Sequence, residues 1–133
     1  MEEALVARLL RTGSLMALVG TRVFWQTRPA EASSLPAITL TVASDGMDYD
    51  MESRSGWQQP RIQFDVRGRS YLEMKKVQRA LLSEMETADS DGAVHFDEAH
   101  MASGGDAPKE TLAGGTEVFR YTMDLMVPFR AKE

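Results

Sequence analysis

The feature that most constrains the fold is a change of hydrophobic period within residues 61–76. Ile62, Phe64 and Val66 alternate with polar residues, a pattern typical of a half-buried strand. Residues 70–73, with the sequence SYLE, then match a capping box, which marks the beginning of a helix. The sequence therefore predicts a strand that runs directly into a helix.

The same two periods predict the other elements of the chain. Apolar residues at helical spacing predict helices over residues 2–11, 15–19 and 71–86. Alternating residues predict strands over residues 22–25, 38–42, 61–67, 93–97 and 117–129. In the first helix, Arg8 and Arg11 are expected to point away from the apolar side. The last strand would be about 40 Å long, so part of it is expected to project.

Two segments have the composition of loops. Residues 102–115 contain four glycines and a proline, which predicts a mobile surface loop. Residues 44–59 are rich in turn-forming residues, and they also carry four large apolar side chains. These are Met47, Tyr49, Met51 and Trp57. They are expected to pack either on the chain's own core or on a neighbouring subunit, because aromatic residues and methionine are enriched at interfaces.

The order of the predicted elements indicates an α+β fold. We expect residues 1–133 to form a single domain, which is long enough to bury a core of its own. Its predicted architecture is a mainly antiparallel sheet of about four to five strands. One long helix and a short N-terminal helical segment would pack on one face of that sheet.

Composition excludes several classes of protein. The chain has no cysteine, so it can form neither a disulfide nor a thiolate metal site. Its formal net charge of −5 argues against a protein that wraps nucleic acid, because such binding requires an excess of Lys and Arg. No apolar run reaches the roughly 20 residues that span a bilayer, and the first residues are acidic, unlike those of a signal peptide. We therefore expect a soluble chain without membrane contact.

Motifs that carry chemistry are scarce. The sequence contains no nucleophile elbow, no phosphate-binding glycine loop and no dinucleotide-binding fingerprint. His95, Asp97 and His100 could supply ligands to a metal, but their spacing matches no known ligand pattern, and a solvent-facing strand explains them equally well. We therefore expect no catalytic site, no cofactor and no metal site.

The basic residues allow two interpretations. Arg61, Asp65 and Arg67 form the polar face of one strand, and they are expected to face either solvent or a neighbouring subunit. A small nucleic-acid-binding regulator is the alternative. It would use the basic residues Arg67, Arg69, Lys75, Lys76 and Arg79.

Four segments together resemble one protein family. They are LVGTRVF at 18–24, LPAITL at 35–40, RIQFDV at 61–66 with its capped helix, and FRYTMDL at 119–125. In this order they are similar to the tail-completion proteins, or tail terminators, of long-tailed bacteriophages and of phage-like gene transfer agents. The resemblance extends over nearly the whole chain, but it transfers no individual functional residue.

The resemblance implies a structural protein of the virion that is made in the cytoplasm of the host bacterium. Such proteins form a hexameric ring that ends the tail tube at its head-proximal end and docks to the head–tail connector. The implied partners are other copies of the chain, the tail tube protein and the connector or stopper protein. DNA would pass through the ring without specific binding, and an acidic protein suits such a conduit. A stopper or adaptor of the head–tail junction is the nearest alternative.

Ring formation requires a subunit interface, and seven residues are the candidates for it. They are Met47, Tyr49, Met51, Trp57, Arg61, Asp65 and Arg67. If Arg67 lies in that interface, replacing it with Glu should weaken assembly and leave the monomer folded.

Overall fold

The computed structural model describes residues 2–11, 13–20, 22–25, 35–44, 58–87, 89–91, 94–111, 115 and 117–131. Its helices are α1 (Glu2–Leu10), α2 (Gly13–Val19) and α3 (Tyr71–Met85). Its strands are β1 (Val23–Trp25), β2 (Ala37–Ser44), β3 (Arg61–Gly68), β4 (Asp89–Asp91), β5 (Val94–Phe96), β6 (His100–Thr111), β7 (Glu117–Met126) and β8 (Phe129–Ala131).

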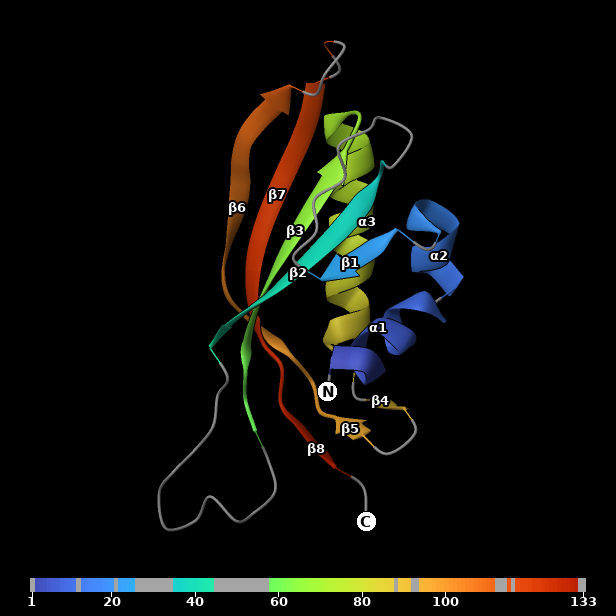
Figure 1. The fold of residues 1–133 in the computed structure, drawn as a ribbon, viewed down its shortest axis with the longest axis vertical. Helices are drawn as coiled ribbons and strands as arrows, with labels where there is room; N and C mark the ends of the chain where they lie inside the picture. Colours follow the sequence, from blue (N-terminus) through green and yellow to red (C-terminus); the bar gives the residue numbers. More distant parts are fainter. Residues whose placement is uncertain are drawn as a thin grey trace.

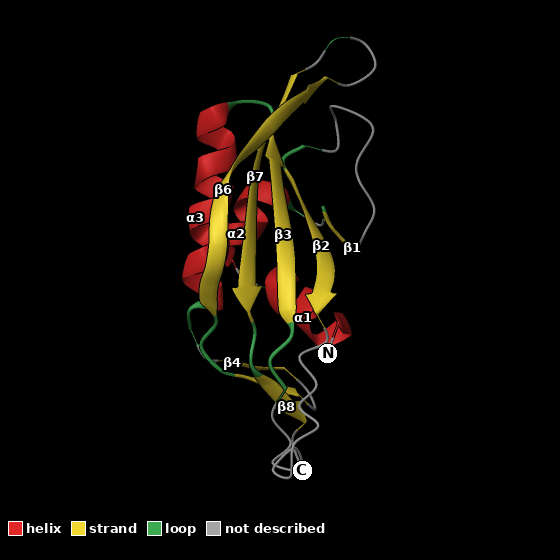
Figure 2. Cartoon of the chain, turned by 90° about the vertical axis from the view of Figure 1, so that its left-hand side faces the viewer, coloured by secondary structure: helices red, strands yellow, loops and turns green. Residues whose placement is uncertain are grey.

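Five strands form the main sheet in the order β1-β2-β3-β7-β6, and β4-β5-β8 form a smaller one. In the main sheet only the β1–β2 pair is parallel. Figures 1 and 2 show the three helices on one face of the main sheet, and among the described residues no helix lies on the other face, here named the open face. The predicted α+β class, with a mainly antiparallel sheet and helices on one face, is confirmed.

The strand-to-helix unit of residues 61–76 organises the core. Ile62, Phe64 and Val66 of β3 are fully buried, and on α3 the buried side chains are Met74, Val77, Gln78, Leu81 and Met85. The predicted start of the helix is confirmed, because the Ser70 hydroxyl accepts a hydrogen bond from the Glu73 N–H at 3.1 Å. The Glu73 carboxylate in turn accepts one from the Arg69 N–H at 2.9 Å.

The prediction of a loop over 102–115 is wrong for residues 102–111, which belong to the 12-residue strand β6. β6 pairs with β7 from His100–Met126 to Thr111–Glu117, with two shifts of register. Backbone pairing with the strongly apolar strand β7 therefore holds this segment as a strand, although its own side chains give no strand pattern. Of the predicted loop 44–59, residues 45–57 lie outside the described residues.

The C-terminal strand is shorter than its pattern predicts. β7 ends at Met126, and Pro128 separates it from β8, which pairs with β5 in the smaller sheet. Proline lacks an N–H group and interrupts a ladder, so the chain changes sheet at this point. The projecting strand predicted over 117–129 is therefore wrong at its far end.

The N-terminal helices also differ in detail from the expectation. α2 begins at Gly13, two residues before the predicted start at residue 15. Arg8 is fully buried, so the expectation that it points away from the core is wrong. Within the described part of the chain, no helix has the length and apolarity needed to span a bilayer.

Candidate functional site

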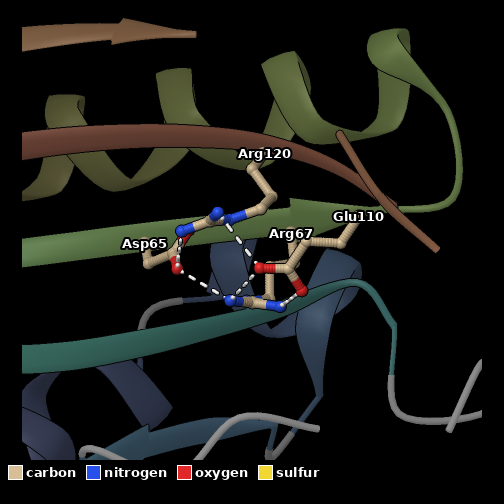
Figure 3. Close-up of polar contacts among 4 residues, drawn as sticks. All are labelled: Asp65, Arg67, Glu110 and Arg120. Carbon is tan, nitrogen blue, oxygen red and sulfur yellow. Dashed lines mark hydrogen bonds and ion pairs between the residues drawn. The ribbon is translucent and has the colours of Figure 1, made fainter. Parts of the chain in front are cut away.

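The open face of the main sheet carries a compact cluster of two arginines and two carboxylates, shown in Figure 3. The Asp65 carboxylate accepts hydrogen bonds from Arg67 Nη2 and from Arg120 Nη2, both at 3.0 Å. The Glu110 carboxylate accepts from Arg67 Nη1 at 2.7 Å, and Arg120 Nη1 lies 3.0 Å from it. The cluster therefore joins β3, β7 and β6, and its formal charges cancel.

Arg67 is the centre of this cluster, and it is only 1% exposed. Burial by itself lowers the pKa of Arg67, but the hydrogen bond to Glu110 and the charges of Asp65 and Glu110 outweigh it, so the pKa is raised. Arg67 therefore remains a cation held by its own chain. The expectation that it faces solvent or a neighbouring subunit is wrong for this side chain.

The other predicted interface residues divide into two groups. Arg61 is presented at the surface, since its side chain is 42% exposed, and its Nε lies 2.8 Å from Asp124 Oδ2. Asp65 is buried in the cluster. Met47, Tyr49, Met51 and Trp57 lie outside the described residues.

The histidines do not converge on a metal site in the part of the chain that the structure describes. His95 lies on β5, opposite Ser90 and Arg130, whereas His100 begins β6 opposite Met126. The Asp97 carboxylate accepts a hydrogen bond from the Glu98 N–H at 2.8 Å. Among the described residues, no group of three or more His, Asp or Glu side chains is placed to hold a metal ion.

The first edge of the main sheet is formed by β6, which sequence reasoning missed. Most of its side chains are exposed on both faces. On the helix side, Met101 lies opposite the core residue Leu125 and is 38% exposed. The turn-forming glycines at 114 and 115, between two extended segments, were the one signal for a hairpin here.

A small network holds β6 to α3 on the helix side. The Tyr71 hydroxyl donates to Asp106 Oδ2 at 3.1 Å, and Lys75 Nζ lies 3.5 Å from Asp106 Oδ1. The Lys75 ammonium also lies 4.4 Å from the centre of the Tyr121 ring, which is a cation–π distance. Burial by itself lowers the pKa of Lys75, but the hydrogen bond to Tyr71 and the charge of Asp106 raise it overall.

The second edge of the main sheet is β1, and an apolar groove of ≈ 400 Å³ lies beside it. Four apolar residues line the groove together with Glu3: Val6, Ala7, Leu10 and Trp25. The Arg22 carbonyl faces β2, because it accepts a hydrogen bond from the Ile38 N–H at 3.0 Å. Since backbone groups alternate along a strand, those of Val23 and Trp25 point to the outer side of the sheet.

Comparison with known proteins identifies a family. The model of the family described as "Tail completion protein gp17" matches residues 3–106. Comparison with curated proteins found no matching sequence. A solved structure described as "Virion of native gene transfer agent (GTA) particle" contains a chain with 18% sequence identity and a TM-score of 0.63. The similarity covers 100% of the present chain and 95% of that chain, so the two share a fold over their length.

Proposed function

Because the chain belongs to the family of tail completion protein gp17, we propose that it is a structural virion protein that ends the tail tube of a phage or phage-like particle. In this proposal copies of the chain form a hexameric ring at the head-proximal end of the tube. One side of the ring contacts the tube protein, and the other contacts the head–tail connector. The family match over residues 3–106 is the observation that carries the proposal.

The arrangement of the sheet supports ring formation. The main sheet ends in two different strands, β1 and β6, so the chain offers two unlike edges. A contact between unlike surfaces repeats from copy to copy, and it closes into a ring when the rotation fits. The whole-length likeness to a chain of a gene transfer agent particle supports the same role.

The charges favour a conduit over a nucleic-acid reader. Arg61, Arg67 and Arg120 of the open face each lie within 3.0 Å of a carboxylate of the same chain. Arginines that are already paired contribute little to phosphate binding, and the whole chain is acidic. We expect DNA to pass through the ring without specific binding, and the residues that line the channel to be mostly Asp and Glu.

Five of the predicted interface residues remain part of this proposal. The exposure of Arg61 at the beginning of β3 supports its proposed contact with a neighbour. Met47, Tyr49, Met51 and Trp57 remain proposed contacts of the ring or of its partners, because apolar side chains in a polar segment need a surface to cover them.

Electron cryomicroscopy of assembled particles tests the role. We expect density for a ring of this chain between the tail tube and the head connector. Particles made without the chain are the control, and their tubes should vary in length. Density for the chain elsewhere in the particle would instead support a stopper or adaptor. Absence of the chain from the particles would contradict a virion role and restore the nucleic-acid-binding regulator.

A further inference from the structure

We propose that neighbouring copies of the chain join edge to edge, with β6 of one copy adding to β1 of the next and Met101 entering the groove between α1 and β1. The inference rests on the proposed ring and specifies its interface. It follows from four features of the chain: the two strand edges, their directions, their side chains and their height along the long axis of the molecule.

Among the described residues, β6 and β1 each have a strand neighbour on one side only. β6 extends over 12 residues at the outer side of the sheet, and β7 is its strand partner among the described residues. On β1, the outward backbone groups belong to Val23 and Trp25. An open strand edge binds an added strand through main-chain hydrogen bonds.

The strand directions are compatible. β2 runs parallel to β1, and each step from β2 through β3 and β7 to β6 reverses the direction. β6 therefore runs antiparallel to β1 within one copy. A rotation about an axis along the strands preserves direction and keeps the helices of both copies on the same side. The new pair would be antiparallel, the arrangement that forms most readily between separate strands.

The side chains on the helix side are complementary. Met101 of β6 is 38% exposed, and its partner Leu125 belongs to the core face. The groove beside β1 lies on the same side of the sheet, because α1 lines it. A flexible and apolar methionine suits an apolar groove of irregular shape. Each copy of the chain thus carries both parts of the contact, Met101 on β6 and the groove beside β1.

The two halves lie at matching levels. In Figures 1 and 2 the beginning of β6 and helix α1 lie at a similar height along the long axis of the molecule. Rotation about an axis in that direction leaves the height of every residue along the axis unchanged. It therefore brings the beginning of one copy's β6 toward α1 of the next. The contact is heterologous, as a ring requires.

Disulfide trapping tests the contact directly, because the chain has no cysteine of its own. Purified Ala7→Cys and Met101→Cys proteins are mixed at a concentration at which the wild-type chain is oligomeric, and then oxidised. We expect a covalent dimer that joins position 7 of one copy to position 101 of the other. Mass spectrometry of the digested dimer identifies the linkage.

A matched control separates this contact from random collision. Met16 on α2 is exposed, as Ala7 on α1 is, so Met16→Cys replaces Ala7→Cys in the control mixture. If the oligomers yield no more of the 7–101 linkage than of the 16–101 linkage, the inferred contact is wrong. That result would not contradict the proposed ring. If the chain is monomeric at every concentration, a second copy of the chain is not the occupant of the groove. Cryomicroscopy of particles then decides the proposed function independently.

A charge-reversal pair provides the second test. Glu3 lines the groove, so Met101→Glu should repel it and raise the concentration needed for assembly by about tenfold or more. Adding Glu3→Lys to the same chain should restore assembly, whereas a misfolded variant would not recover. Leu72→Glu, on an exposed residue of α3, is the control and should assemble normally. If Met101→Glu also assembled normally, Met101 would not enter the groove.

Discussion

The guanidinium of Arg8 closes the C-terminal end of α3 at Glu84. Arg8 Nη2 donates to the Glu84 carbonyl at 2.6 Å, and Arg8 Nε donates to the Glu84 carboxylate at 2.9 Å. Arg8 Nη2 also donates to the carbonyl of Thr87, and the guanidinium lies 5.4 Å from the centre of the Phe96 ring. A buried cation therefore adds hydrogen bonds to carbonyls at the end of the helix, although that of Glu84 also accepts one from the Thr87 N–H at 3.1 Å, and it fixes α1 against α3.

Replacing Arg8 tests the importance of this contact. We expect Arg8→Met to lower the free energy of unfolding by about 3 kcal/mol, because it removes the buried cation that pairs with the Glu84 carboxylate and its hydrogen bonds to two carbonyls. Arg79→Met, on the exposed side of α3, should change it by less than about 0.5 kcal/mol. Urea unfolding followed by circular dichroism measures both variants. Equal stability of Arg8→Met and the wild type would mean that water satisfies the carbonyls.

The strand-to-helix unit could be predicted from sequence because local signals and tertiary packing agree there. Ile62, Phe64 and Val66 alternate as a strand does, and all three are buried. Ser70 and Glu73 form their cap within four residues of chain, so no distant contact was needed to foresee it.

The contacts that could not be predicted depend on residues far apart in the sequence. Arg8 lies 76 positions from Glu84, and Arg67 lies 43 positions from Glu110. A charged residue on a short helix or strand normally indicates a solvated face, and only the folded chain shows that a partner covers it. β6 was missed for the same reason, since its pairing depends on β7 and not on its own pattern.

The arginine–carboxylate cluster predicts non-additive effects of mutation. Arg67→Met leaves two carboxylates with one arginine, so we expect it to lower the free energy of unfolding by about 2 to 3 kcal/mol. Adding Glu110→Gln restores the balance of charge between Asp65 and Arg120. The double variant should therefore lose about 1 to 2 kcal/mol less than the sum of the single variants.

Thermal and urea unfolding of the four proteins of this cycle provides the measurement. Arg69→Met is the control, because Arg69 is 54% exposed in its ion pair with Glu73 and such pairs contribute little. Strict additivity would show that Arg67 and Glu110 do not act as a unit. Arg67→Glu, considered above as an assembly variant, should instead destabilise the monomer.

Gly68 should tolerate no side chain. A Cβ atom added there would lie 2.8 Å from the backbone nitrogen of Met74, and the backbone of α3 cannot move away without disturbing the core. We expect Gly68→Ala to lower the free energy of unfolding by about 2 kcal/mol. Gly105→Ala on β6, where an added Cβ meets nothing within 4 Å, should be neutral or slightly stabilising. A stable Gly68→Ala protein would imply that α3 can shift relative to β3.

The Lys75 network predicts a loss of stability at high pH. The pKa of Lys75 is raised above its ordinary value of 10.5, so the charged form is favoured in the folded state. Its contribution is therefore fully present below pH 10.5 and is lost as the pH rises through the raised pKa. We expect Lys75→Met to be less stable than the wild type at neutral pH, and this difference should shrink above pH 10.5. Lys76→Met, which changes an exposed lysine on the same helix, corrects for general alkaline effects. A difference that stayed constant with pH would show that the charge of Lys75 is not the source of the stabilisation, since a charge effect must disappear on deprotonation.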